Sequence, residues 1–128
     1  MMITSLYAAL LAFWLVILSI RVIALRGNPV FKIFGFRHAG EASLERAIRA
    51  HGNFTEYTPI FLIMLFLAEQ QGIPSLQLHS LAIAFSCGRL MHGICFSFLA
   101  QNMFLRVCGT VLTLFPILGL AVRLLISG

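Results

Sequence analysis

The stretch from Glu45 to Pro59, ERAIRAHGNFTEYTP, gathers charged and amide side chains inside a sequence that is otherwise mostly apolar. If this stretch is helical, successive side chains turn by about 100°, and four of them share an arc of roughly 80°: Arg46, Arg49, Asn53 and Glu56. Guanidinium groups bind carboxylates in a bidentate manner, and a carboxylate can bind an ammonium group. This face could therefore hold a zwitterionic or polyanionic ligand, such as a small peptide with free termini.

A structural explanation of the same polar face stays open. The two arginines and the carboxylate could pair with one another, or with Glu45 and Arg89, and so lock a helix bundle, because buried charges in proteins are commonly paired internally. Tyr57 lies at the edge of the polar face, and His51 lies on the opposite side, where we expect a packing role. The sequence favours neither explanation of the charged groups over the other.

The composition indicates that the solvent is a bilayer rather than water. Hydrophobic residues make up 60% of the 128 and charged residues 10%, against about 45–50% and about 25% in soluble domains. Four helices are predicted, over residues 3–25, 43–70, 76–100 and 104–126, each near or above the roughly 20 residues of a membrane span. We therefore expect an all-α integral membrane four-helix bundle, formed by residues 1–128 as one domain, with Ser43 as the N-cap of the second helix.

The second predicted helix is unusual because its purely apolar part, Pro59 to Ala68, covers only about 15 Å. Charged side chains that face lipid cost several kcal/mol each, so the polar half should face other helices, a water-filled cavity or a second subunit. We therefore predict an oligomer in which this helix lines an interface.

The positive charges are concentrated in a few places along the chain. Arg21, Arg26, Lys32 and Arg37 lie at the end of the first helix and in the first loop, and Arg106 follows the third loop, whereas the loop from Gln70 to Gln77 has no positive charge. By the positive-inside rule, the first and third loops are cytoplasmic and both termini are non-cytoplasmic. The net charge of +5 does not indicate nucleic-acid binding, since the arginines are scattered among apolar spans and form no continuous basic patch.

The third predicted helix repeats the polar pattern more weakly. Arg89 and His92 are three residues apart and so share a face, which Phe96 continues. Gly88 and Gly93 flank this pair, and small residues allow helices to approach closely. On the fourth helix, Arg106, Thr110 and Thr113 share one side.

Several kinds of chemistry find no support in the sequence. Cys87, Cys95 and Cys108 lie inside predicted spans without a CxxC pair, so we expect buried free thiols. The histidines have no partners at metal-ligand spacing, and no metal site is predicted. Because no Ser-His-Asp set or carboxylate pair is present, an enzyme here would work by positioning an anion and stabilising it electrostatically.

The segment Arg46-Ala-Ile-Arg49-Ala-His51-Gly-Asn53-Phe-Thr-Glu56-Tyr57-Thr-Pro59 resembles the R-x-x-R-A-x-x-N-x-x-E-Y-x-P signature of the MAPEG family, the membrane-associated proteins in eicosanoid and glutathione metabolism. Gly88-Arg89-Leu-Met-His92 resembles the matching segment of the third helix, and the likeness is greatest to the small bacterial inner-membrane branch. The resemblance implies a homotrimer of four-helix protomers that holds glutathione between adjacent subunits near the cytoplasmic side.

The resemblance also implies roles for individual residues. The candidate glutathione-binding residues are Arg26, Arg49, Asn53, Glu56, Tyr57, Arg89 and His92. Among them, Arg26 would correspond to a basic residue at the end of the first helix. Arg106 falls within one residue of the family arginine that stabilises the glutathione thiolate, which makes it the candidate catalytic residue. A nearby cation lowers the pKa of a thiol, and the thiolate is the nucleophile.

The sequence departs from the family pattern at two aromatic positions. Relatives that make eicosanoids carry tyrosines where this chain has Phe96 and Thr110, so a specialised eicosanoid synthase is not expected. The favoured function is a microsomal-type glutathione transferase or peroxidase acting on hydrophobic electrophiles. The alternative is a non-catalytic trimer that binds lipids or other hydrophobic ligands, since a fold alone does not fix a function. A small multidrug exporter is a more distant alternative, because the first helix lacks the carboxylate used for proton coupling.

Overall fold

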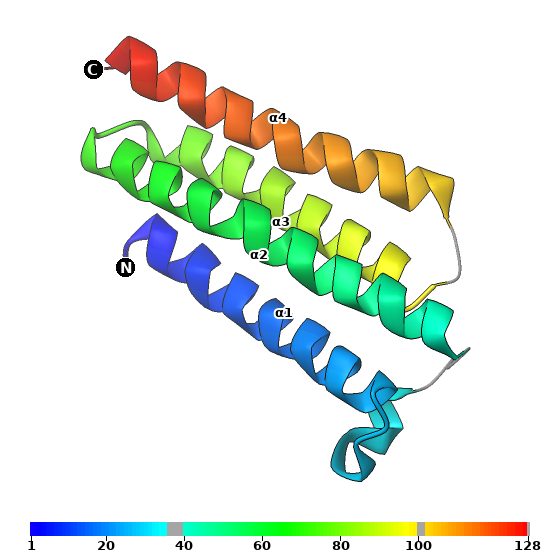
Figure 1. Ribbon diagram of the computed structural model, residues 1–128. Helices are drawn as coiled ribbons and strands as arrows, with labels where there is room; N and C mark the ends of the chain where they lie inside the picture. Colours follow the sequence, from blue (N-terminus) through cyan, green and yellow to red (C-terminus); the bar gives the residue numbers. More distant parts are fainter. Residues whose placement is uncertain (36–39, 100–101, 128) are drawn as a thin grey trace.

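Four long helices lie side by side in the computed structural model, which describes residues 1–35, 40–99 and 102–127 (Figure 1). They are α1 (Ile3–Leu25), α2 (Glu41–Gln70), α3 (Ser75–Ser97) and α4 (Met103–Ser127), and a short 3₁₀ segment, η1 (Pro29–Gly35), follows α1. No strand occurs in the three described ranges. The prediction of an all-helical chain is therefore confirmed. Helices α2 and α3 contact each other, α1 packs on both of them, and so does α4.

The start of α2 differs from the prediction. The helix begins at Glu41, so Ser43 lies inside its first turn and the prediction of Ser43 as the N-cap is wrong. The physical reason is Gly40, which takes a φ of 71° and turns the chain directly into the helix. Ser43 is instead buried, and its hydroxyl accepts a hydrogen bond from Arg46 at 3.2 Å. Helix α3 ends at Ser97, and the end predicted for it, Ala100, lies outside the described residues.

Glycines close the first two helices. Gly27 follows α1 with a φ of 91°, and Gly72 follows α2 with a φ of 74°. In this left-handed conformation the next amides turn back to the helix, as Asn28 N–H does to the carbonyl of Ile23. Such an ending satisfies carbonyl groups that the helix itself leaves free, and glycine adopts it without a Cβ penalty.

The N-terminus of α1 is capped by a residue that is distant in sequence. No side chain near Met2 caps the helix. Instead, the carboxylate of Glu69, at the end of α2, accepts the amide of Ile3 at 2.6 Å and the amide of Thr4 at 3.0 Å. A carboxylate at this position also interacts favourably with the positive end of the helix dipole. Glu69 thereby ties the start of α1 to the end of α2.

We expect Glu69→Ala to lower the free energy of unfolding by about 1 kcal/mol, the usual loss when an N-terminal cap is removed. Hydrogen exchange at the Ile3 and Thr4 amides should become faster in the variant, and the denaturation midpoint in detergent should fall. Gln70→Ala, at the exposed neighbouring position, is the matched control. Unchanged exchange at both amides in Glu69→Ala would show that the carboxylate does not cap α1.

Arg21 is an interior residue, although its position near the end of α1 suggested a membrane-surface charge. Its side chain is buried. Its guanidinium donates hydrogen bonds to the carbonyls of Ser97 and Phe34 and lies 5.1 Å from the centroid of the Phe98 ring. Arg21 therefore fixes the end of α1 against α3 and η1.

Three helices, α1, α3 and α4, are long and apolar enough to cross a membrane. The fourth, α2, is longer than any of them but carries the charged residues of the polar face, and it packs between α1 and α3. Large apolar side chains such as Phe13 on α1 and Val111 and Leu118 on α4 are exposed on the outer surface of the protomer. A surface of this kind is stable in contact with acyl chains rather than with water.

The interior of the bundle is closely packed. The rings of Phe61 on α2 and Phe85 on α3 stack with centroids 3.8 Å apart. On the α1 side, the indole N–H of Trp14 donates to the carbonyl of Arg89 at 3.3 Å, and a Cβ on Gly93 would lie 2.8 Å from the indole ring. His51 bonds Ser19 of α1 at 3.0 Å, which confirms the packing role expected for it.

Glycines also bring α3 and α4 into backbone contact. A Cβ on Gly88 would lie 2.8 Å from the backbone of Leu112, and a Cβ on Gly109 would lie 2.9 Å from the amide nitrogen of His92. Neither position can carry a larger residue unless the helices separate. The predicted close approach at Gly88 is confirmed, and it places the polar side of α4 beside His92.

Candidate functional site

A groove composed of three adjoining hollows runs between α2, α3 and α4. The first hollow, of about 490 Å³, is lined by Arg46, Arg49, Cys95, Phe96, Asn102, Met103 and Arg106. The second, of about 340 Å³, is lined by Arg49, Gly52, Asn53, Glu56, His92, Phe96 and Arg106. The third, of about 40 Å³, is lined by Asn53, Tyr57, Arg89, His92, Thr110, Thr113 and Leu114. The first and second hollows share Arg49, Phe96 and Arg106, and the second and third share Asn53 and His92. The groove is therefore continuous.

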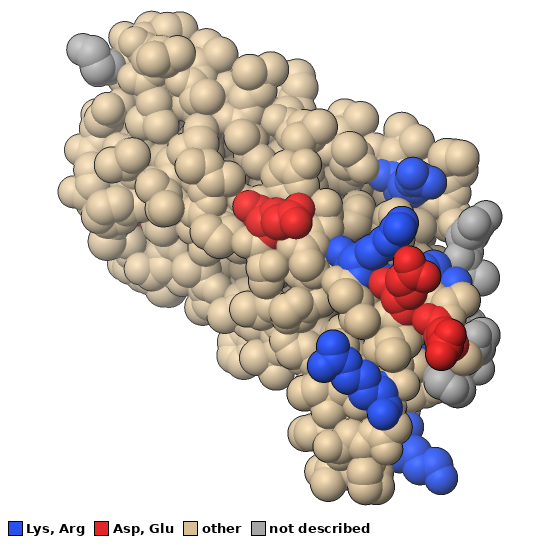
Figure 2. All heavy atoms as spheres, viewed as in Figure 1, with Lys and Arg blue, Asp and Glu red and all other residues tan. Residues whose placement is uncertain are grey.

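Charged side chains gather at one end of the molecule (Figure 2). In that view, basic and acidic residues lie over the start of α2, the end of α1 and the start of α4, with one acidic patch nearer the middle of the face. The visible surface at the opposite end shows neither the blue of basic residues nor the red of acidic residues. The groove therefore opens where the electrostatic field of the protein is concentrated.

Arg49 forms an ion pair with Glu45, one turn earlier on α2, at 3.7 Å. The two side chains are 70% and 72% exposed, and exposed pairs of this kind contribute little to stability. Arg46, by contrast, donates to Ser43. Both guanidiniums line the first hollow, so a stronger anionic partner there could replace or supplement these contacts.

Arg106 stands over an aromatic platform at the junction of the two larger hollows. Its Cζ lies 5.9 Å from the centroid of the Phe96 ring, which in turn stacks on His92 with centroids 4.5 Å apart. A cation within about 6 Å of a ring face is attracted by the ring quadrupole. No carboxylate of the described ranges pairs with Arg106. Its charge is therefore directed into the groove without an anionic partner from the protomer.

Arg89 lies beneath the groove. Its side chain is 2% exposed, and its Nη2 donates to the amide oxygen of Asn53 at 2.8 Å while its Cζ lies 5.7 Å from the Tyr57 ring centroid. The hollow beside it has about the volume that one or two waters occupy. Arg89 Nε and His92 Nδ1 are buried without a hydrogen-bond partner among the described residues. Arg89 thus holds the amide of Asn53, which lines both the second and the third hollow.

The bundle-locking explanation of the polar face finds little support within one protomer. Glu56 is exposed and forms no ion pair with a described residue, and Arg89 is held by an amide and an aromatic ring rather than by a carboxylate. Only the exposed pair of Arg49 with Glu45 corresponds to that explanation.

The structure brings together most, but not all, of the predicted site residues. Arg49, Asn53, Glu56, Tyr57, Arg89, His92 and Arg106 all line the groove. Arg26 does not: it is exposed at the end of α1 and lines a separate hollow of about 490 Å³ together with Lys32. Helix α1, which carries Arg26 at its end, does not contact α4, which carries Arg106.

Several lining residues were not predicted to belong to the site, and among them are Cys95 and Asn102. All three cysteines were expected to be buried free thiols. The prediction is confirmed for Cys95 and wrong for Cys87, which is exposed, while Cys108 is half-buried. The Sγ of Cys95 donates to the carbonyl of Asn102 at 3.3 Å, and both residues line the first hollow. Cys95 lies three residues after His92 and next to Phe96, so its helical spacing was the signal that could have placed it there. The position of Asn102, ahead of α4, gave no such signal.

Comparison with known proteins places the chain in a family. The sequence model of the MAPEG family matches residues 4–126. A protein from Escherichia coli strain K12, "Inner membrane protein YecN", is 35% identical over 91 residues, which cover 71% of this chain and 67% of that protein. The protein of the same name from Escherichia coli O6:H1, strain CFT073, gives the same values. No solved structure matches at a significant level. The family match extends over nearly the whole chain and confirms the resemblance seen in the helix-two and helix-three motifs, so this chain is a membrane protein of the MAPEG family.

Proposed function

We propose that the chain is a glutathione-dependent membrane transferase or peroxidase that acts on hydrophobic electrophiles dissolved in the bilayer. The charge set of the groove carries this proposal. Glutathione with an ionised thiol has two carboxylates, one thiolate and one ammonium group. The two larger hollows are lined by three arginines and one carboxylate, Arg46, Arg49, Arg106 and Glu56, so each charged group of the peptide has a partner of opposite sign.

The proposed roles follow from the positions of the side chains. Arg49 and Arg46 bind the two carboxylates of the peptide, and Glu56 binds the ammonium group. Asn53, held by Arg89, presents its amide to the peptide backbone, and Tyr57 and His92 close the inner end of the groove. These contacts would fix the peptide in one orientation and place its sulfur near Arg106.

Arg106 then supports the chemical step. Its positive charge stabilises the thiolate relative to the thiol, and the released proton leaves through the open groove. In a transfer, the thiolate sulfur forms a bond to an electrophilic carbon while the leaving group departs with the electron pair of the broken bond. No phenolic hydroxyl stands at Phe96 or Thr110, so Arg106 is the main source of this stabilisation.

A homotrimer is part of the proposal. The groove is open on one side and Arg49 is largely exposed in a single protomer, although it belongs to the polar face of α2 that should avoid lipid. A second subunit that covers α2 would bury this face and could bring its own Arg26 to the peptide. Helix α2 is then the interface helix, and each site is completed by two chains.

We expect native mass spectrometry and crosslinking of the detergent-purified protein to show three subunits. Cysteine introduced at Ile48, an exposed position on α2, should form intersubunit crosslinks, while cysteine at Leu125, an exposed position near the end of α4, should not. A monomer at all protein concentrations tested would contradict the trimer and leave the charged face of α2 without a partner.

We also propose an inner-membrane location with both termini on the non-cytoplasmic side. The support comes from the exposed Arg26 and Lys32 at the end that bears the groove, and from the name of the Escherichia coli relative. Arg37, which entered the same prediction, lies outside the described residues. A C-terminal fusion to a reporter that works only outside the cytoplasm should be active, and a fusion to a cytoplasmic reporter should be inactive. Activity of a cytoplasmic reporter at that position would reverse the topology and place the groove on the other side.

Calorimetric titration with glutathione, followed by a turnover assay with a chlorodinitrobenzene-type acceptor, tests the function. Saturable binding with conjugation supports the transferase. Binding without conjugation, and without reduction of an organic hydroperoxide, would favour the non-catalytic ligand-binding trimer, for which the missing phenolic hydroxyls are the supporting observation. Absence of binding would exclude both glutathione-dependent activities.

A further inference from the structure

A separate hollow, of about 650 Å³, lies between α3 and α4 at the end of the bundle opposite the groove. It is formed by the start of α3 and the last turns of α4, where both chain ends also lie (Figure 1). Its volume falls in the range of sites that bind small molecules, about 300–1,000 Å³. None of the residues that line the groove takes part in it.

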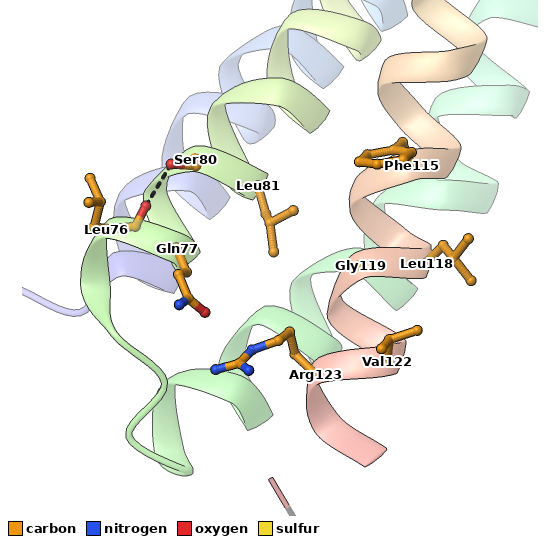
Figure 3. A pocket seen from close by; sticks show the side chains of 9 residues that line it. All are labelled: Leu76, Gln77, Ser80, Leu81, Phe115, Leu118, Gly119, Val122 and Arg123. Carbon is orange, nitrogen blue, oxygen red and sulfur yellow. Dashed lines mark hydrogen bonds between the residues drawn. The ribbon is translucent and has the colours of Figure 1, made fainter. Parts of the chain in front are cut away.

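The hollow has apolar walls and one charged end. Leu81 from α3 and Phe115 from α4 extend into the space between the two helices, and Arg123 reaches from α4 toward Gln77 (Figure 3). The Ser80 hydroxyl is already satisfied, since it donates to the carbonyl of Leu76 at 2.7 Å. The polar groups left for a ligand are therefore those of Arg123 and Gln77.

Arg123 is the charged side chain of the hollow. It forms no ion pair with a described residue, and its Nε is buried without a hydrogen-bond partner in the described part of the chain. Among the described side chains, the carboxylate of Glu69 lies at this end of the bundle, and it accepts the amides of Ile3 and Thr4. No other Lys or Arg in the described ranges lies at this end. An anion that entered the hollow would meet the guanidinium of Arg123, the charged group among the residues that line it.

The position of Arg123 along the helix matches the level of lipid headgroups. It stands four residues before the end of the apolar helix α4, or about 6 Å along its axis. Phe115 lies eight residues earlier, about 12 Å deeper. A long basic side chain near the end of a span extends its charge to the interface while its stem stays in the apolar layer. The charged end of the hollow thus faces headgroups and its walls face acyl chains.

We propose that this hollow binds an anionic phospholipid of the surrounding bilayer, with the lipid phosphate on Arg123 and one acyl chain between Leu81 and Phe115. The positive charge of Arg123 favours an anionic headgroup. Because this charge lies nearer the end of α4 than the apolar walls do, a bound lipid would have the same orientation as the lipids of the surrounding bilayer. The site is separate from the proposed glutathione groove and does not depend on it.

Native mass spectrometry of the protein released from mixed micelles tests the proposal, with dioleoyl phosphatidylglycerol and dioleoyl phosphatidylcholine as probes. The two lipids share their acyl chains and differ in net charge. The parent protein should retain the phosphatidylglycerol about fivefold more strongly, the scale of one cation near an anionic lipid surface. Arg123→Gln should remove this preference, and Arg123→Lys should restore most of it. Lys32→Gln, an exposed cation at the other end of the molecule, is the charge control and should leave the preference unchanged.

A second variant tests the apolar part of the site without changing charge. A Cβ on Gly119 would approach the Leu81 methyl at 3.2 Å, so Gly119→Leu should fill the hollow and weaken retention of both lipids. Val111→Leu, which adds a carbon at an exposed position of the same helix, should have no effect. Equal retention of the two lipids by the parent, or an unchanged preference in Arg123→Gln, would overturn the proposal. Displacement of the phospholipid by lower concentrations of oleate would also overturn it, because the occupant would then be a fatty acid.

Discussion

Replacing Arg106 by leucine is expected to slow glutathione conjugation by about 10²-fold or more, the usual scale for removing a preorganised charge from a developing anion. The affinity for glutathione should stay within about tenfold of the parent value, because the carboxylates of the peptide are proposed to bind elsewhere in the groove. The rate is expected to change more than the affinity because Arg106 forms no ion pair with a residue of the described ranges and lies at the junction of the two larger hollows.

The measurement is the thiolate absorbance of bound glutathione followed against pH, together with the rate of conjugation. In Arg106→Leu the thiol pKa should rise, so the thiolate band should appear at higher pH than in the parent. Lys32→Leu, which removes an exposed cation outside the groove, is the matched control. An unchanged thiolate titration and an unchanged rate in Arg106→Leu would assign this arginine to anchoring α4 at the membrane interface.

Replacing Arg49 by alanine is expected to weaken glutathione binding by at least ~2 kcal/mol, or about 30-fold, the low end of losing one partner of a buried charge-assisted contact. In the protomer Arg49 is exposed and pairs only with Glu45. The predicted loss therefore measures what Arg49 does once the peptide, and a neighbouring subunit, cover it. Arg46→Ala should have a smaller effect, since Arg46 already bonds Ser43.

Calorimetry on Arg49→Ala and Glu45→Ala separates the ligand contact from the surface ion pair. Glu45→Ala breaks the same pair but leaves the guanidinium in place, so its glutathione affinity should be close to that of the parent. If Arg49→Ala folds and binds glutathione as tightly as the parent does, the polar face of α2 is structural and the proposed site is wrong.

Much of the fold could be predicted because its signals are local. Long apolar stretches define α1, α3 and α4, and a glycine two residues beyond the last helical residue, Gly27 or Gly72, marks where α1 and α2 end. The predicted start of α2 was wrong because the helix begins after Gly40, a glycine with positive φ, and not after a side-chain cap at Ser43. The cap of α1 could not be predicted, since Glu69 lies 66 residues from the amide of Ile3 and only the folded bundle brings them together.

The residues that share one face of a helix could be predicted from the sequence, but how deeply each of them lies in the groove could not. Helical spacing put Asn53 and Glu56 on one face of α2 and put Arg89 and His92 on one face of α3. Spacing within a helix says nothing about which neighbour that face meets. The contact between Gly88 and Gly109 decides this, because it brings α4 against α3 and leaves Arg106 at the mouth of the groove and Arg89 at its base.

The position of the single tryptophan allows its intrinsic fluorescence to report on the groove. Trp14 is the only indole in the chain, and its N–H is bonded to the carbonyl of Arg89, the residue whose side chain holds Asn53 at the base of the groove. Indole emission depends on the polarity and hydrogen bonding around the ring, so a ligand that shifts Arg89 changes the fluorescence of Trp14 from the far side of α3. Occupancy of the groove by a ligand can thus be followed in unlabelled protein, in detergent or in vesicles, through a residue that does not line the groove.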